Sequence, residues 1–325
     1  MPVTDITTDA ENLTMTLVAD VAAPVDRLWR AFTQPAQLER FWGPPGWPAT
    51  FTRFDFVAGG RAQYAMTSPQ GEKSRGTWEF IAIDEGRSFE VLDAFADENG
   101  DPMEQFPAMR MIFSFDETDA GSRLTNVTYF TSAEGLEQVI AMGAIEGSRL
   151  AMGQLDAVVQ DLRSFAQGRG TSTELLDDTH VRITRLIDGP RDLVWRAHHE
   201  TELLKKWMLG PDGWSMTVAE PATEVGARYR YGWEQDGAPE TAFGFEGELL
   251  QLDAPRREVT TERMSGTEGP ATINDLQLYE EDGATLLTLL IEYPDKDTRD
   301  MILATGMADG MEASYARLES AVVGA

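Results

Sequence analysis

The chain has 325 residues, of which 55 are acidic and 27 basic, giving a net charge of −28. Sequence-independent binding to phosphates needs a surplus of Lys and Arg, so this charge argues against nucleic acid and anionic membrane surfaces as partners. The absence of cysteine excludes disulfides, thiol catalysis and thiolate metal sites, and we expect neither a metal site nor a cofactor.

Localisation and histidine usage narrow the function classes further. No stretch approaches the roughly 18 uninterrupted apolar residues of a membrane span, and the polar residues 1–14 do not resemble a secretory signal. We therefore expect a cytoplasmic protein that does not enter the membrane. The three histidines, His180, His198 and His199, all lie in the second half, so no His-based site can occur in both halves.

The first half begins with a segment typical of a strand, Thr14–Val21, followed by short helices predicted at 25–32 and 35–41. Pro24 stands at the entry of the first helix, where proline is tolerated. The longest element, 132–165, has apolar residues at a helical period and a capping box at its start. Between the helices, alternating segments predict an antiparallel meander of strands at 50–57, 61–67, 77–83, 88–94, 109–115 and 124–130.

The second half repeats the first. Segment 21–47 recurs within 186–214 with one inserted residue. The matched residues are Pro24, Trp29, Phe41, Trp47, Gly59, Arg61, Tyr64, Gly143 and Gly147 in the first copy, and Pro190, Trp195, Trp207, Trp214, Gly226, Arg228, Tyr231, Gly306 and Gly310 in the second. Two copies at such a long period exclude a solenoid and indicate a duplicated domain. We expect domains at 1–166 and 179–325 joined by a polar linker at 167–178.

Each copy consists of a strand, two short helices, about six strands and one long helix, and the final helix of the second copy is predicted at about 297–322. A strongly bent antiparallel sheet wrapped around a long helix would bury both apolar faces. The sequence therefore predicts an α+β fold in two tandem domains.

Several residues carry a resemblance to a known superfamily. Pro24, Trp29 and Phe32, followed by LERFWGP at 38–44 and a Gly-Gly-Arg before a strand, resemble the START-like, helix-grip superfamily. More narrowly, the chain is similar to the branch named after the C-terminal domain of the activator of the heat-shock-protein-90 ATPase. The second copy departs from this pattern, with Met-Leu-Gly-Pro at 208–211 in place of Trp-Gly-Pro, so its cavity mouth is expected to differ.

The resemblance implies a cavity between the sheet and the final helix. Members of the superfamily use it to hold lipids, sterols, polyketides and other apolar molecules. Some relatives are aromatases or cyclases, others are carriers, and others are chaperone partners. The fold alone does not select among these functions.

Aromatic and methionine side chains accumulate on the strands that should face the helix, and tryptophans stand beside Gly-Pro turns that could edge the cavity entrance. Methionine adapts to irregular surfaces, and Tyr or Trp adds a polar group to an apolar wall. Ordinary core packing is the alternative for each side chain. The candidate ligand-binding residues are Trp42, Trp47, Tyr64, Met66, Trp78, Phe89, Met111, Phe113, Gly143, Gly147, Trp214, Tyr231, Trp233, Phe243, Phe245, Met264, Gly306 and Gly310.

The glycines among these candidates have two interpretations. Gly143 and Gly147 lie one helical turn apart, as do Gly306 and Gly310, although each glycine costs roughly 1 kcal/mol relative to alanine inside a helix. Either the helix packs closely on the sheet at these points, or space is left open for a ligand. Both interpretations point this face of the helix inward.

No catalytic residue is assigned from the sequence. General acid–base catalysis needs a carboxylate or histidine held inside the cavity. Strand alternation places Glu79 and Glu248 outward, as well as Arg61 and Arg228, and the pair at 198–199 is interpreted as a solvated helix end.

The leading hypothesis is therefore non-catalytic binding of a small apolar or amphipathic molecule. A cyclase- or aromatase-like enzyme and a protein-binding, chaperone-associated module remain alternatives, and a protein partner or homo-oligomer stays open.

Overall fold

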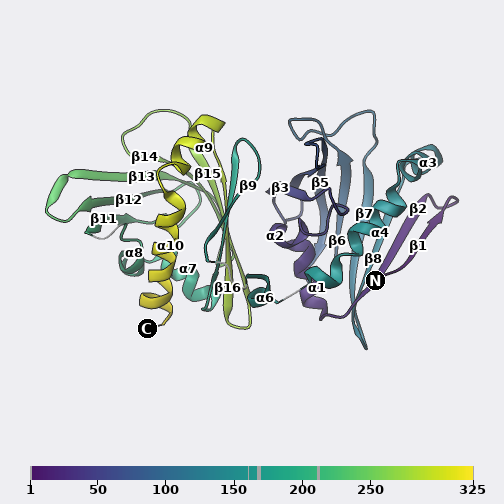
Figure 1. The fold of residues 1–325 in the computed structure, drawn as a ribbon, viewed down its shortest axis with the longest axis horizontal. Helices are drawn as coiled ribbons and strands as arrows, with labels where there is room; N and C mark the ends of the chain where they lie inside the picture. Colours follow the sequence, from purple (N-terminus) through teal and green to yellow (C-terminus); the bar gives the residue numbers. More distant parts are fainter. Residues whose placement is uncertain (1, 160, 167–169, 211–212, 325) are drawn as a thin grey trace. The chain divides into compact units, whose positions relative to one another are not determined.

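The computed structural model describes the chain except residues 1, 160, 167–169, 211–212 and 325. It contains two compact units, residues 1–160 (the first unit) and 161–325 (the second unit) (Figure 1). Each unit has an eight-stranded, antiparallel sheet combined with helices. The predicted α+β fold of two tandem domains is thereby confirmed.

The sheet of the first unit has the order β1-β2-β8-β7-β6-β5-β4-β3. Its strands are β1 (Val3–Asp9), β2 (Thr14–Val21), β3 (Ala49–Phe54), β4 (Arg61–Thr67), β5 (Lys73–Asp84), β6 (Ser88–Phe95), β7 (Met109–Thr118) and β8 (Gly121–Tyr129). Its helices are α1 (Val25–Thr33), α2 (Pro35–Leu38), α3 (Ala133–Ala141), α4 (Ala144–Met152) and α5 (Leu155–Val158).

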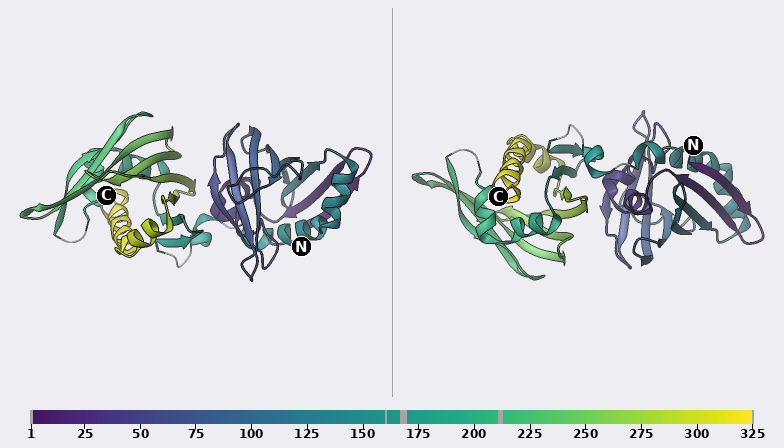
Figure 2. Two further views of the ribbon diagram at one scale, coloured as in Figure 1. Left: turned by 90° about the horizontal axis from the view of Figure 1, so that it is seen from above. Right: turned by 90° about the horizontal axis from the view of Figure 1, so that it is seen from below.

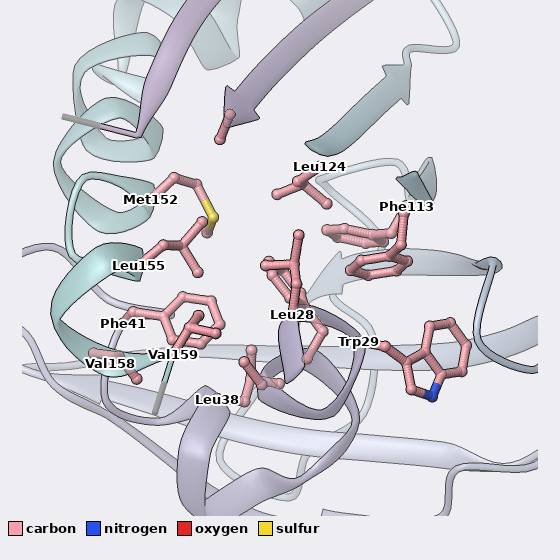
Figure 3. Packing of buried hydrophobic residues seen from close by; sticks show 14 of the residues in the cluster. Leu28, Trp29, Leu38, Phe41, Phe113, Leu124, Met152, Leu155, Val158 and Val159 are labelled. Atoms are coloured by element: carbon pink, nitrogen blue, oxygen red, sulfur yellow. The ribbon is translucent and has the colours of Figure 1, made fainter. Parts of the chain in front are cut away.

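One face of this sheet forms the core together with the helices. Burial alternates along β2, with every second residue from Met15 to Val21 buried, because successive side chains of a strand point to opposite faces. Leu28 of α1 and Phe41 after α2 lie in the same buried cluster as Leu155 of α5 (Figure 3). The short helices and the C-terminal segment therefore share one apolar core with the sheet.

The single long helix predicted at 132–165 is wrong: the segment is broken. Ser132 caps α3 as expected, accepting a hydrogen bond from the backbone N–H of Gly135 at 3.0 Å. The helix then breaks at Gly143, whose φ of 89° lies in the left-handed region that favours glycine. A helical period in the sequence continues through such a break, since the apolar face is preserved on both sides of it.

The sheet of the second unit has the order β11-β12-β13-β14-β15-β16-β10-β9. Its strands are β9 (Ser172–Leu175), β10 (His180–Ile187), β11 (Trp214–Glu220), β12 (Arg228–Gln235), β13 (Ala238–Asp253), β14 (Arg257–Met264), β15 (Thr272–Glu281) and β16 (Ala284–Glu292). Its helices are α6 (Leu162–Ala166), α7 (Arg191–His199), α8 (Thr201–Trp207), α9 (Lys296–Leu303) and α10 (Met307–Leu318), followed by a π-helical turn, Glu319–Val323.

The second unit repeats the helix break. Gly306 precedes α10 with a φ of 82°, so its final helix is also two segments and not the one helix predicted at 297–322. Tyr315 and Leu318 of α10 pack in a buried cluster with Leu287 of β16. Figure 2 shows the final helices of each unit on one side of its curved strands.

The domain boundaries differ from the prediction at the junction. Helix α6, expected to end the first domain, contacts β10 and β16 of the second unit. Part of the predicted linker, 167–178, is strand β9, which pairs antiparallel with β10 from Val181↔Leu175 to Thr184↔Ser172. Strands β1 and β9 hold the same edge position in the two sheets, so the second repeat begins earlier than the sequence comparison indicated. Residues 167–169 lie outside the described part of the chain.

Candidate functional site

An acid occupies the same position in both sheets, buried in the first and partly buried in the second. On β5 and β6, Gly76 pairs with Phe95 and Trp78 pairs with Asp93. On β13 and β14, Phe245 pairs with Met264. Phe95 and Met264 hold matching positions in these pairings. Asp93 lies two residues before Phe95 and Glu262 two residues before Met264, so the two acids are equivalent and lie on the same face of their strands as those residues.

In the first unit, Asp93 is held by two side chains. It is 9% exposed, and its Oδ1 accepts hydrogen bonds from Tyr64 Oη at 3.1 Å and from Trp78 Nε1 at 2.8 Å. Among the described residues no protein group donates to Oδ2 of Asp93. A buried carboxylate with one satisfied and one open oxygen can accept a further hydrogen bond from a bound molecule.

The burial of Asp93 and Tyr64 shifts the pKa values of both groups. Burial raises the pKa of Asp93 from 3.8 to about 6, although the hydrogen bonds from Tyr64 and Trp78 oppose the rise. Burial, and then the charge of Asp93, raise the pKa of Tyr64 well above its ordinary value. Tyr64 is therefore a neutral hydrogen-bond donor, while Asp93 changes its charge close to neutral pH.

Trp42 adds a third polar group to this wall. Its ring packs edge-on against Trp78, with centroids 4.8 Å apart and planes at 86°, and also against Tyr64 at 6.1 Å. Its Nε1 is buried and has no hydrogen-bond partner within the described parts of the chain. A buried indole N–H normally finds an acceptor, so Trp42 leaves an open donor in the first unit.

A glycine on the neighbouring strand lets the tyrosine reach its acid. Tyr64 pairs with Gly76 across β4 and β5, and a Cβ on Gly76 would collide with the Tyr64 ring. In the second unit Tyr229 pairs with Gly247, and a Cβ there would contact the Tyr229 ring. Glycine in a strand interior commonly marks such a close approach.

The second unit builds the same motif with its tyrosine two residues earlier on β12 and its glycine two residues later on β13, at the positions of Ala62 and Trp78 in the first unit. Tyr229 Oη donates to the Thr261 carbonyl at 2.9 Å and also lies 3.3 Å from Glu262 Oε2. Burial raises the pKa of Glu262, opposed by hydrogen bonds from Asn274 and Tyr229. Each unit therefore has a tyrosine that crosses a glycine to reach an acid on the inner face of its sheet, which we call the tyrosine–glycine–acid motif.

The histidines contradict the interpretation of a solvated helix end. His198 is buried, and burial lowers its pKa to about 4. His199 stacks on Trp195 with ring centroids 4.0 Å apart, and its Nε2 lies 3.0 Å from Glu258 Oε2. Burial alone would lower the pKa of His199, but the hydrogen bond to Glu258 and the charge of Glu258 raise it.

The candidate residues of the first unit separate into two groups. Trp78, Phe89 and Phe113 are fully buried, with stacked Phe89 and Phe113 rings 4.7 Å apart. They are core, although Trp78 also contacts Asp93. The partly buried candidates that pack against this core are Trp42, Tyr64, Met66 and Met111. Trp47 is also partly buried, and its backbone N–H closes a turn onto the Pro44 carbonyl.

The second unit is less uniform. Trp233 is buried and its Nε1 donates to the Met208 carbonyl at 2.7 Å. Phe243 and Met264 are 37% and 49% exposed, so the structure does not place them with the core residues. The partly buried candidates that pack against the core are Trp214, Tyr231 and Phe245.

The matched glycines do not mark close helix-to-sheet packing. A Cβ added at Gly143, Gly147, Gly306 or Gly310 would meet no atom within 4 Å. Gly143 and Gly306 serve backbone conformation, because both have positive φ. Close packing is excluded by this geometry, and the inward orientation expected of this helix face is wrong at Gly143, Gly306 and Gly310, which are exposed.

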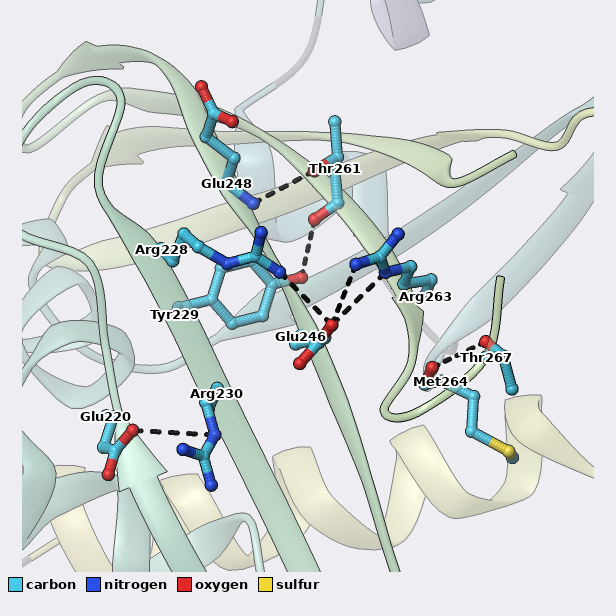
Figure 4. Close-up of polar contacts among 10 residues, drawn as sticks. All are labelled: Glu220, Arg228, Tyr229, Arg230, Glu246, Glu248, Thr261, Arg263, Met264 and Thr267. Atoms are coloured by element: carbon cyan, nitrogen blue, oxygen red, sulfur yellow. Dashed lines mark hydrogen bonds and ion pairs between the residues drawn. The ribbon is translucent and has the colours of Figure 1, made fainter. Parts of the chain in front are cut away.

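The sequence pattern did not single out Asp93 and Glu262, the acids of the tyrosine–glycine–acid motif. Glu79, Glu248, Arg61 and Arg228 are exposed, as predicted. On the outer side of the second sheet, Glu246 Oε1 accepts from Arg228 and Arg263 at 3.2 and 3.0 Å (Figure 4). Strand alternation could have revealed Asp93, because it lies on the same face of β6 as the buried Phe89 and Val91.

Two absences hold for the described part of the chain. Within the described residues, no group of three or more His, Cys, Asp or Glu side chains could hold a metal ion. No helix of this part of the chain is long and apolar enough to cross a membrane.

Comparison with known proteins gives the family. A family model described as Activator of Hsp90 ATPase homolog 1-like protein matches residues 22–160 and 188–323. No curated protein matches the chain.

Among solved structures, protein Ms6760 from Mycobacterium smegmatis is 47% identical over 49% of this chain and 98% of its own length, with a TM-score of 0.47. A protein from Arthrobacter aurescens is 39% identical over 48% of this chain and 91% of its own, with a TM-score of 0.46. DynU16, described as a protein in the dynemicin biosynthetic locus, is 14% identical over 95% of this chain and 99% of its own, with a TM-score of 0.33. Since the family model covers most of both units, the chain belongs to the Activator of Hsp90 ATPase homolog 1-like family and contains two copies of its domain.

Proposed function

We propose that each unit binds a small, largely apolar molecule in its interior, between the sheet and the final helices, and that Asp93 or Glu262 holds a polar group of that molecule. The family fold supports a ligand-binding or cyclase-like module. The tyrosine–glycine–acid motif supplies the site within that fold.

The open oxygen of Asp93 is the observation that carries this proposal. Burying a carboxylate is costly unless its oxygens are satisfied. Both protein donors reach Oδ1 of Asp93, and within the described residues Oδ2 has no donor. A ligand hydroxyl or amine that donates to Oδ2 would complete the site.

The surroundings of the motif suit an apolar ligand body. Met66 and Met111 lie partly buried beside Tyr64 and Trp42 at the edge of the first core. Flexible thioethers and aromatic rings with few polar groups are typical linings of small-molecule sites. The ligand then has an apolar body against these side chains and a polar group at Asp93.

Binding is tested with the full-length protein and a neutral apolar fluorophore, N-phenyl-1-naphthylamine. We expect saturable binding with up to two molecules per chain. Met111→Trp fills space inside the first unit and should lower the stoichiometry by one. Leu92→Trp, on the exposed face of β6, is the matched control and should leave the stoichiometry unchanged. Non-saturable binding, or equal effects of both variants, would contradict the proposal.

A second function is favoured by one observation. An acid with a pKa of about 6 beside a neutral tyrosine is suited to general acid–base catalysis near neutral pH. A cyclase-like first unit should then abstract a proton from the small apolar probe 5-nitrobenzisoxazole, with a rate that rises through pH 6.

Variants separate this second function from background catalysis. Asp93→Asn should abolish the rate above buffer. Glu90→Gln, on the opposite face of β6 and paired with Arg110, should retain it. A wild-type rate equal to that of buffer would leave binding as the function.

A further inference from the structure

Four interior positions change from apolar to polar between the units. Strand pairing and the order of elements match Ala62, Phe89, Met111 and Phe130 of the first unit with Tyr229, Glu258, Asn274 and Tyr293 of the second. At the matched positions the second unit therefore carries two carboxylates, Glu258 and Glu262, where the first carries Phe89 and Asp93.

Glu262 stands at the centre of these polar groups. Burial, followed by the charge of Glu262, raises the pKa of Tyr229, and the same two causes raise that of Tyr293 to about 12. For Tyr231, burial is followed by the charges of Glu258 and Glu262. All three hydroxyls therefore lie within the electric field of Glu262 and stay protonated.

Asn274 leaves an open acceptor at this point. Asn274 lowers the pKa of Glu262, which is the effect expected when its amide N–H groups face the carboxylate. Its Oδ1 is buried and has no hydrogen-bond partner in the described part of the chain. The reverse orientation would place Oδ1 against the carboxylate oxygens, which repel it. A ligand that donates hydrogen bonds fits this group.

Three cations of the second unit are engaged with acids other than Glu262. His199 pairs with Glu258 at 3.0 Å. Arg257 pairs with Asp275 at 2.7 Å, and Arg299 with Asp300. None of the ion pairs of the described residues includes Glu262. A partly buried acid without a cation is stabilised by a cation brought in from outside.

From these contacts we infer that the second unit selects an apolar molecule with a protonated amine, which Glu262 and Asn274 Oδ1 bind. The inference rests on the proposed function and specifies the ligand class of one unit. The rings of Tyr231 and Tyr293 add faces that attract a cation. The first unit should show a weaker preference for the amine: Asp93 can accept from it, but Phe89 and Met111 replace Glu258 and Asn274, and the open group at Trp42 is a donor.

The test compares two probes of the same shape on the full-length protein at pH 7.5. 1-Naphthylmethylamine is cationic at this pH and 1-naphthalenemethanol is neutral, and calorimetry measures both affinities. We expect the amine to bind the second unit at least tenfold more tightly than the alcohol. Glu262→Gln should weaken amine binding at least tenfold and change alcohol binding less than twofold.

Three further variants locate the effect. Asn274→Met copies the first unit and should weaken amine binding severalfold. Glu246→Gln removes an outward-facing acid of the same unit and should change neither affinity. Asp93→Asn, in the first unit, should leave the amine preference intact.

The outcomes distinguish this inference from the proposed function. Equal affinities for the two probes, or a preference lost in Asp93→Asn and kept in Glu262→Gln, overturn the inference while binding stands. Failure of both naphthalene probes, together with failure of the neutral fluorophore, overturns the proposed function itself.

Discussion

The two units share a scaffold and differ in what they place inside it. Both break their final helix at a glycine of positive φ, and both aim a tyrosine across a glycine at an acid of the inner sheet face. The first holds Asp93 with Tyr64 and Trp78, whereas the second surrounds Glu262 with tyrosines and an amide. The comparison teaches that backbone requirements are retained while interior polarity changes.

The largest expected effect tests whether the aromatic wall of the first unit is structural. Trp78 is fully buried, so Trp78→Ala should destabilise the first unit by about 3–5 kcal/mol through lost burial and an unfilled space. Trp47→Ala, at a partly exposed side chain outside the core cluster, should cost much less. Urea unfolding of both variants checks this, and equal losses would contradict a structural role specific to Trp78.

The next effect concerns the acid of the first unit. The folded-state pKa of Asp93, about 6, exceeds its ordinary value of 3.8, so the folded state holds the proton more tightly. This stabilisation is complete below 3.8 and is lost as pH rises through 6. Asp93→Asn should gain about 2 kcal/mol of stability relative to wild type between pH 4.5 and 8. Urea unfolding across this range measures it, and a pH-independent difference would refute the burial argument.

The helix breaks give a smaller pair of effects with opposite signs. Gly143→Ala should cost about 1–2 kcal/mol, because its φ of 89° strains any residue with a Cβ. Gly147→Ala, inside α4 with no atom within 4 Å of the added Cβ, should stabilise by about 0.5–1 kcal/mol. Gly306→Ala and Gly310→Ala should repeat these signs in the second unit. Thermal unfolding compares the four variants, and a different pattern in the second unit would break the equivalence.

The smallest effect belongs to the second unit alone. The pKa of His199 is raised, so its pair with Glu258 contributes stability below the ordinary histidine pKa of 6.5. That contribution is lost as pH rises through the folded-state value. Glu258→Gln should flatten this part of the stability profile, as measured by urea unfolding from pH 5.5 to 8.5. Glu248→Gln, at an exposed acid, should leave the profile unchanged.

Much of the fold could be predicted from the sequence because its signals are local. Pro24 starts α1, and the residues that follow at helical spacing, Leu28, Trp29 and Phe32, are buried as the pattern indicates. Strand β1 gives no such signal, since it is an edge strand whose residues after Val3 are largely exposed. Its recognition depends on pairing with β2, which lies elsewhere in the chain.

The site was harder to predict because its acids look like surface residues. Asp93 lies between buried apolar residues of β6, and its strand parity could have placed it inside. Glu262 lies between Thr260 and the exposed Met264 on its face of β14, so no buried apolar side chain marks that face, and only its pairing register shows that it matches Asp93. The burial of His199 depends on Glu258, an acid that replaces Phe89 on a distant strand.

At one matched pair of facing positions, the large side chain and the small one lie on opposite strands in the two units. Ala62 faces Trp78 in the first unit, and Tyr229 faces Gly247 in the second. Any route of single substitutions between these arrangements passes through two large residues that clash or two small ones that leave a hole. The halves are therefore not interchangeable residue by residue. A chimaera of the two would have to transplant both strands as one block.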